Sequence, residues 1–473
     1  MYLEKPGLNF FKINFKGIKL LLNTLFLSYL TLSTAAQDAN LMFFDFIPHI
    51  HNFNPAIRPD STVIILSPNI YFDIWTNTFG LKNVFSRKAG NDNKKYFDLN
   101  YIIDHSEDEN FLYGTLDYSL LFMGKIMSNG FYATFSVNEK NNYNFLVPKD
   151  LFEFSLGNAD YEAQAQRNFD WEGLSVNGIS YTSYSFGLLK EFGSDFQFGL
   201  HLKLLDGKYV TETSNFDARL KTGNDFDQVY IEADIRYKQS APGLNDDHNE
   251  EVYFSAGNLS QPFFLHNNLF KNSGFACDFG FHYSPDDKTS VLGSVTDIGF
   301  IKWNAEQREL HYKGSYNFTG FDLSPNSEGY FDLNESINTV IDSIKNVFEP
   351  VLDRTDPFRT RITPRILFGL SRTISRHFEL LGLFRAGIYS CYTDYRYTLG
   401  IIYKLSPNLH LSFSTSCKNN KIGNFGAGMV CRIKGVEMFL SSENVESLIA
   451  NSSSINVSFG LNFILLNVGY HKK

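Results

Sequence analysis

Apolar and polar residues alternate over long stretches of the chain after residue 36. Residues 196–204 (FQFGLHLKL) and 455–463 (INVSFGLNF) alternate without exception. Four further stretches break the pattern once each: residues 229–237, 275–283, 395–403 and 409–417. A period of two residues is that of a β-strand whose two faces meet different surroundings. The pattern therefore predicts an all-β fold.

The two faces of these strands differ in chemistry. In residues 196–204 one face carries only Phe and Leu, whereas the other carries Gln197, Gly199, His201 and Lys203. A soluble sandwich would bury the apolar face against a second sheet. A transmembrane barrel would turn that face to lipid and the polar face to a lumen. Strand lengths of about ten residues and a 16% aromatic content, which suits interfacial girdles, favour a transmembrane antiparallel β-barrel.

The connections between strands alternate between short and long. Short polar turns occur at residues 192–195 (FGSD), 284–288 (SPDDK), 375–377 (SRH) and 406–408 (SPN), and long excursions at 239–272 and 324–361. Outer-membrane barrels have this asymmetry, with short periplasmic turns and longer extracellular loops. Counting candidate strands predicts about 14, with a range of 12 to 18. A barrel of about 14 strands has room for a plug or a narrow route, but not for a wide pore.

Two segments within the long connections have a helical pattern. Asn334 is a candidate N-cap for a helix whose apolar residues share one face, and Pro350 follows the end of that helix. Asp98 is placed to cap a shorter helix. Each helix is interpreted either as a lid or lumenal element or as an amphipathic cap on an external loop. The second interpretation is favoured, because an apolar stripe needs only some surface to cover.

The N-terminus has the features of a signal peptide. Lys12, Lys16 and Lys19 precede an apolar run over residues 20–32, and small residues follow at 34–36. The run is too short to span a membrane, so we expect residues 1–36 to be removed. Those residues hold four Lys and one Glu, so the net charge changes from −9 to −9 − 3 = −12. An acidic chain disfavours a nucleic-acid partner.

Composition excludes several other classes of protein. An apolar content of 43% excludes disorder, and the 34 Gly and 14 Pro show no collagen-like period. No run after residue 36 is long and apolar enough for a spanning helix. The four cysteines lack metal-type spacing, which leaves disulfides or small apolar strand positions. With a turn at residues 419–420, Cys417 and Cys431 would lie too far apart to bond.

A family resemblance begins directly after the signal segment. Asn54-Pro55-Ala56 and Arg58-Pro59-Asp60 lead into a strand at residues 62–66. This resembles the N-terminal segment of FadL-like long-chain fatty-acid transporters and of the secretion component PorV. Residues 148–154 (PKDLFEF), 272–280 (NSGFACDFG) and 294–303 (SVTDIGFIKW) also resemble a family of predicted outer-membrane barrels of unknown function, distantly akin to FadL.

The resemblance implies a barrel in the cell outer membrane, at residues 62–473, with an N-terminal hatch or plug at 37–61. The hatch would include Asn54, Pro55, Ala56, Arg58, Pro59 and Asp60. Its charges could pair with side chains on the polar strand faces. The candidate lumen-facing residues are Asp278, Asp297, Arg236, Arg385, Arg396, His201 and His282.

Signals for chemistry are weak in comparison. His49 and His51 lack a third metal ligand, and the acidic loop at residues 246–251 is interpreted as solvated. No catalytic or cofactor motif is found, so we expect no enzyme activity and no cofactor. Three functions are carried forward: passage or binding of a hydrophobic small molecule, docking of secreted proteins in the manner of PorV, and a lipid or peptide hydrolase built on His201 or His282.

Overall fold

The computed structural model describes most of the chain after residue 41. The described residues are 42, 44, 47–58, 61–81, 83–87, 95–127, 129–160, 165–223, 228–240, 269–319, 333–353, 356–389, 393–419, 421–433, 435–448 and 452–469. The predicted signal peptide, residues 1–36, and the acidic loop at 246–251 lie outside them.

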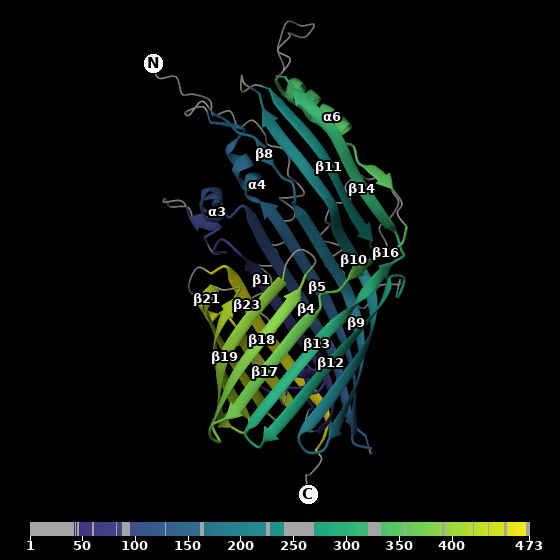
Figure 1. Cartoon of the computed structure of the whole chain (residues 1–473), viewed down its shortest axis with the longest axis vertical. Coiled ribbons are helices and arrows are strands. Elements are labelled where there is room, and N and C mark those ends of the chain that lie inside the picture. Colours follow the sequence, from purple (N-terminus) through teal and green to yellow (C-terminus); the bar gives the residue numbers. More distant parts are fainter. Residues whose placement is uncertain are drawn as a thin grey trace.

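Fourteen antiparallel strands close into a barrel (Figure 1). In order around the wall they are β1 (Ser61–Thr76), β4 (Glu109–Ile126), β5 (Phe131–Pro148), β9 (Ser175–Phe192), β10 (Phe196–Thr222), β12 (Ser273–Asp286), β13 (Thr289–Trp303), β17 (Arg365–Thr373), β18 (Phe378–Ile388), β19 (Thr393–Ser406), β20 (Leu409–Lys418), β21 (Lys421–Ile433), β22 (Val436–Ser442) and β23 (Ser454–Gly469). β1 pairs with both β4 and β23, which closes the ring without a free edge. The predicted all-β barrel of about 14 strands is confirmed.

Apolar and polar side chains alternate along the wall strands, as the sequence predicted. On β10, Leu202 and Leu204 are 46% and 48% exposed on the outside, whereas His201 and Lys203 between them are buried inside. Large apolar side chains are exposed in the same way around the ring: Phe186, Phe198, Phe275, Phe279, Phe368, Leu370, Tyr397, Leu399, Phe413, Phe425, Met429, Leu440 and Phe463. An apolar exterior around a polar interior is the pattern of an outer-membrane barrel.

The described helices are short. None of them has the length and apolar character that would be needed to cross a membrane.

The four predicted short turns all lie at one end of the barrel. They join β9 to β10, β12 to β13, β17 to β18 and β19 to β20. The long connections leave from the opposite end, called the upper rim here because it lies at the top of Figure 1. Cys417 pairs with Ile422, and Cys431 pairs with Leu409 at the other end of the hairpin. Both cysteines are free, as is Cys277, so the prediction that Cys417 and Cys431 do not bond is confirmed.

Above the upper rim, part of the wall continues as an extended sheet (Figure 1). β10 is 27 residues long, and its upper half pairs with β11 (Val229–Ser240) and β8 (Phe169–Asp170). β11 pairs in turn with β14 (Gln307–Phe318), and β14 with β15 (Val351–Asp353). β16 (Phe358–Arg361) continues the line of β17 and pairs with β13. The alternation at residues 229–237 therefore belongs to this sheet and not to the barrel wall.

The helices lie in the connections at the upper rim. α3 (Leu99–His105) begins at Asp98, whose side chain accepts a 3.0 Å hydrogen bond from the Tyr101 N–H, as the predicted cap requires. α6 (Leu333–Val347) confirms the second predicted helix and packs on β14. The other short elements are η1 (Pro48–Asn52), α4 (Lys149–Glu153), η2 (Phe154–Leu156), η3 (Val445–Leu448), β2 (Phe85–Arg87), β3 (Lys95–Phe97), β6 (Ala159–Asp160) and β7 (Ala165–Gln166).

Candidate binding site in the barrel lumen

The described residues that precede β1 contact the inner face of the wall on several sides. His51 accepts a hydrogen bond at Nε2 from the Thr134 hydroxyl (3.0 Å), while its Nδ1 donates to the Ile57 carbonyl (2.9 Å). Asn52 bonds Ser119 and Asn138, both at 3.3 Å. These contacts attach residues 47–58, called the N-terminal segment here, to β4 and β5.

Asn54 and Pro55 pack against two paired glycines of the wall. Gly199 on β10 faces Gly280 on β12 in the strand register. A Cβ at Gly199 would lie 2.0 Å from the Pro55 carbonyl oxygen, and one at Gly280 would lie 2.1 Å from Asn54 Oδ1. Only glycine leaves room for so close an approach of another backbone.

The Asn54 side chain links the segment to the wall. Its Nδ2 donates to the Phe281 carbonyl (3.1 Å), and its Oδ1 accepts from the Ala56 N–H (2.9 Å). Asn54 and Ala56 are both fully buried. Arg58 reaches Glu191 at 3.1 Å, while Pro59 and Asp60 lie outside the described residues. The Asn-Pro-Ala motif therefore has a structural explanation in this chain.

The opposite side of the N-terminal segment is apolar. Side chains at the start of the described chain pack with inward-facing residues of β17, β18, β19, β21 and β22 in one buried cluster. Its members are Met42, Phe44, Ile47, Ile50, Ile57, Leu367, Leu383, Ile402, Val430 and Phe439. Burying an apolar side chain of this size contributes about 1.5–3 kcal/mol. The segment is therefore held by hydrogen bonds on one side and by apolar contact on the other.

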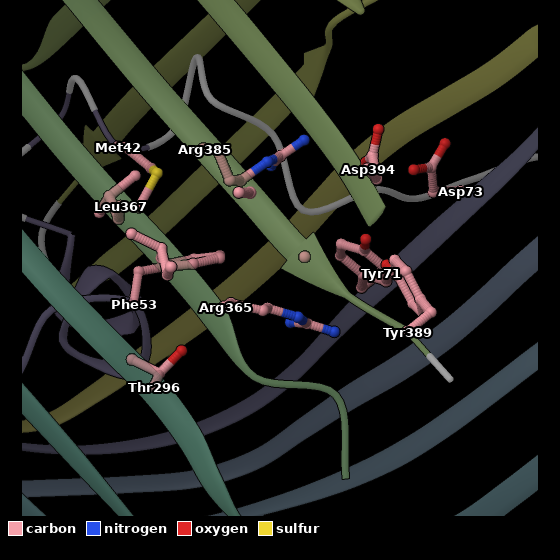
Figure 2. A pocket seen from close by; sticks show the side chains of 13 residues that line it. Met42, Phe53, Tyr71, Asp73, Thr296, Arg365, Leu367, Arg385, Tyr389 and Asp394 are labelled. Atoms are coloured by element: carbon pink, nitrogen blue, oxygen red, sulfur yellow. The ribbon is translucent and has the colours of Figure 1, made fainter. Parts of the chain in front are cut away.

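A cavity lies between this segment and the upper rim (Figure 2). Its empty space, open side included, is about 540 Å³. Met42, Phe53 and Leu367 form an apolar side. The other lining residues include Tyr71, Asp73, Thr296, Arg365, Arg385, Tyr389 and Asp394. Such a mixture of apolar surface with a few polar groups is typical of small-molecule sites.

Three of the predicted lumenal residues, Asp278, Asp297 and His201, meet in one buried cluster with Lys203. Lys203 Nζ lies 2.7 Å from Asp278 Oδ2 and 2.6 Å from Asp297 Oδ1. Asp297 occupies a β-bulge, with φ of 61° and its N–H bonded to Asp278 Oδ1 at 2.7 Å. His201 Nδ1 donates to Asp278 at 2.9 Å. The three charged groups are buried, and Lys203 pairs with both carboxylates.

The two predicted arginines of β18 and β19 share a second carboxylate. Arg385 lies 3.2 Å from Glu443 Oε1, and Arg396 is ion-paired with the same residue. Arg365, on β17, lies 3.9 Å from Asp117, which also pairs with Lys140 at 2.7 Å. Arg365 and Arg385 line the cavity.

The remaining candidates lie elsewhere. Arg236 is on β11 in the extended sheet, outside the barrel wall, and lies 3.4 Å from Asp234. His282 bonds the Ser290 hydroxyl at 2.6 Å and does not line the cavity. His201 is 2% exposed and its ring lies 4.6 Å from that of His51. Neither histidine lines the cavity described above.

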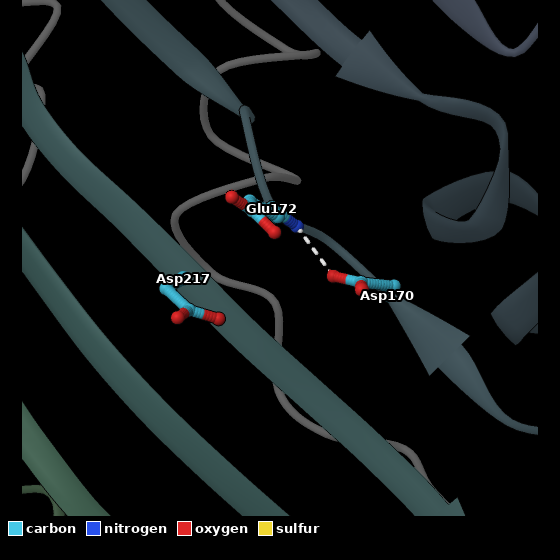
Figure 3. Close-up of side chains that lie close together, drawn as sticks. All are labelled: Asp170, Glu172 and Asp217. Atoms are coloured by element: carbon cyan, nitrogen blue, oxygen red, sulfur yellow. Dashed lines mark hydrogen bonds between the residues drawn. The ribbon is translucent and has the colours of Figure 1, made fainter.

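An acidic group on the extended sheet resembles a metal site only in composition. Oxygens of Asp170, Glu172 and Asp217 come within 4.8 Å of one another (Figure 3). The guanidinium of Arg219 lies 3.1, 2.9 and 3.1 Å from the three carboxylates. The Glu172 N–H and this arginine hold the pKa of Asp170 below its usual value. The arginine therefore supplies the charge that a cation would.

Sequence reasoning missed most of the residues that line the cavity. Tyr71 and Asp73 follow the first predicted strand, which continues from residue 66 to Thr76. Arg365 follows Pro364 at the start of β17, and Tyr389 and Asp394 flank a connection at the upper rim. The signal that the sequence offered for these residues was a charged side chain on the polar face of a predicted strand. It does not reveal which strands meet across a lumen.

Comparison with known proteins identifies the family. The model of the family of unknown function DUF5723 matches residues 55–443. The chain belongs to this family. The match begins at the second residue of the Asn54-Pro55-Ala56 motif and covers most of the barrel. It confirms the resemblance to a family of unknown function. No curated protein matches the sequence.

Solved structures to which the chain is similar include two toluene transporters and a FadL homologue. The toluene transporter TbuX of Ralstonia pickettii is 8% identical with a TM-score of 0.41, over 92% of this chain and 95% of that chain. A FadL homologue of Pseudomonas aeruginosa is 10% identical with a TM-score of 0.41, over 88% and 93%. The toluene transporter TodX of Pseudomonas putida is 10% identical with a TM-score of 0.38, over 91% and 93%.

Proposed function

We propose that the protein is an outer-membrane barrel that binds a hydrophobic small molecule, and lets it pass, at the cavity below the upper rim. The single observation that carries this proposal is the apolar side of that cavity, formed by Met42, Phe53 and Leu367 opposite its polar lining residues. Water-filled lumens are lined by polar groups, so apolar side chains there favour an apolar ligand. No enzymatic role is proposed.

The N-terminal segment gives the site its floor. Its polar contacts reach β4, β5, β12 and β13, and its apolar cluster reaches β17, β18, β19, β21 and β22. We propose that residues 37–61 act as a hatch, so that a ligand bound in the cavity leaves only when this segment shifts. Asn54 and the glycine pair, Gly199 and Gly280, would be the anchor of the hatch.

Two leucines of β17 provide a matched test. Leu367 lines the cavity and is buried, whereas Leu370 points outward and is 50% exposed. We expect Leu367→Trp to fill the apolar side and to reduce uptake of a labelled apolar compound by cells at least about tenfold. Leu370→Trp should leave uptake unchanged. Equal uptake by both variants and by cells that lack the protein would overturn the proposal.

A further inference from the structure

The two arginines of the cavity are already matched with carboxylates. Arg385 pairs with Glu443 at 3.2 Å, and Arg365 faces Asp117 at 3.9 Å. Lys418 lies 3.7 Å from Asp394. What distinguishes the two remaining carboxylates of the cavity, Asp73 and Asp394, is their supply of hydrogen bonds.

Asp73 is a buried carboxylate with a missing donor. It is 3% exposed, lines the cavity from β1, and its Oδ1 accepts no hydrogen bond from any residue that the structure describes. Asp394 reaches the same cavity from β19, and its Oδ1 also accepts none among the described residues. A buried carboxylate oxygen without a donor is costly. Two such oxygens lining one cavity point to a ligand that donates hydrogen bonds.

The surroundings of the two carboxylates suit a cation with an organic body. Tyr71 and Tyr389 lie beside them (Figure 2), and the Tyr113 ring packs against that of Tyr389 at 4.8 Å between centroids. Aromatic rings attract a nearby ammonium group. A hard metal ion would instead ask for six or more oxygen ligands. The apolar side chains opposite, at Met42 and Leu367, would cover the rest of such a molecule.

We propose that the ligand is an amphipathic amine, whose ammonium group donates to Asp73 and Asp394 while its apolar body lies on Met42, Phe53 and Leu367. This inference rests on the proposed function, because it names the chemical class of ligand for the same cavity. Asp394 already has Lys418 3.7 Å away, so Asp73, which has no ion pair among the described residues, is the stronger partner.

Three probes of equal length separate the possibilities: octylamine, octanol and octanoate. Each is titrated by calorimetry into the purified full-length barrel in amphipol, with empty amphipol as the blank. We expect octylamine to bind at least about tenfold tighter than octanol, because its charged ammonium can donate to both carboxylates, whereas the neutral octanol hydroxyl has one proton to donate. Asp73→Asn should remove the preference, and Asp394→Asn should reduce it. Asp217→Asn, on the extended sheet, should preserve it.

The outcomes distinguish this inference from the proposed function. If octanoate or octanol binds at least as tightly as octylamine, the inference of an amine ligand fails. The proposed function, binding of a hydrophobic molecule, then still stands. Calcium or sodium ions that bind alone, displace octylamine and depend on Asp73 would overturn the organic ligand. If none of the three probes binds to a protein that still shows a heat-dependent gel shift, the proposed function fails together with the inference.

Discussion

At the residue scale, the contact between the N-terminal segment and the wall depends on two small positions. Gly199 and Gly280 are paired across β10 and β12, and the backbone at Pro55 and the side chain of Asn54 occupy the space that their missing side chains leave. The sequence showed both the Asn-Pro-Ala motif and the glycines in the polar phase of their strands. It did not show that they touch, because more than a hundred residues separate them.

We expect Gly199→Ala to displace the N-terminal segment. The new Cβ would lie 2.0 Å from the Pro55 carbonyl oxygen, which is backbone and has little room to move. Overpacking of this kind costs about 1–3 kcal/mol. Limited chymotrypsin digestion after Phe53 of the folded barrel should become faster. Gly114→Ala on β4 is the control, since nothing lies within 4 Å of its added Cβ. Equal digestion of the two variants would contradict this contact.

At the element scale, alternation predicted which segments form strands. It did not predict whether a strand lies in the barrel wall or in the extended sheet. Residues 196–204 and 455–463 are wall strands, yet residues 229–237 have the same period and lie in the extended sheet. A strand that is half exposed to water and one that faces lipid both alternate, so period alone cannot separate them. Arg236 was expected in the lumen for that reason. The cap of α3, which depends on local residues, was predictable, whereas α6 begins at Leu333, one residue before its predicted cap, Asn334.

Asp234 predicts how the extended sheet responds to acid. It lies on β11, and hydrogen bonds from Lys313 and His311 lower its pKa to about 2. A depressed carboxylate pKa adds stability that is present above the unfolded value, near 4, and is lost as the pH falls through 2. Pepsin cleavage between β11 and β14 should therefore rise more steeply from pH 4 to pH 1.5 in the natural protein than in Asp234→Asn. Parallel profiles would show that this carboxylate does not stabilise the sheet.

At the scale of the whole molecule, the barrel follows from the sequence and the cavity does not. The apolar outer face, the short turns at one end and the strand count are properties of successive strands, and all were predicted. The cavity joins β1, β13, β17, β18 and β19 with the N-terminal segment. Its composition depends on how the strands are staggered around the ring, which no local pattern records. Asp73 and Arg365 could not have been chosen from the other polar-phase charges.

Ion conductance in a planar bilayer tests the central claim most directly, namely that the N-terminal segment closes the lumen below a ligand cavity. The natural protein should conduct little. A variant that lacks residues 42–58, shown by its heat-dependent gel shift to be a folded barrel, should open a steady pore, because the contacts of this segment with both sides of the wall would be gone. High conductance of the natural protein, or no change on removal of the segment, would contradict the account.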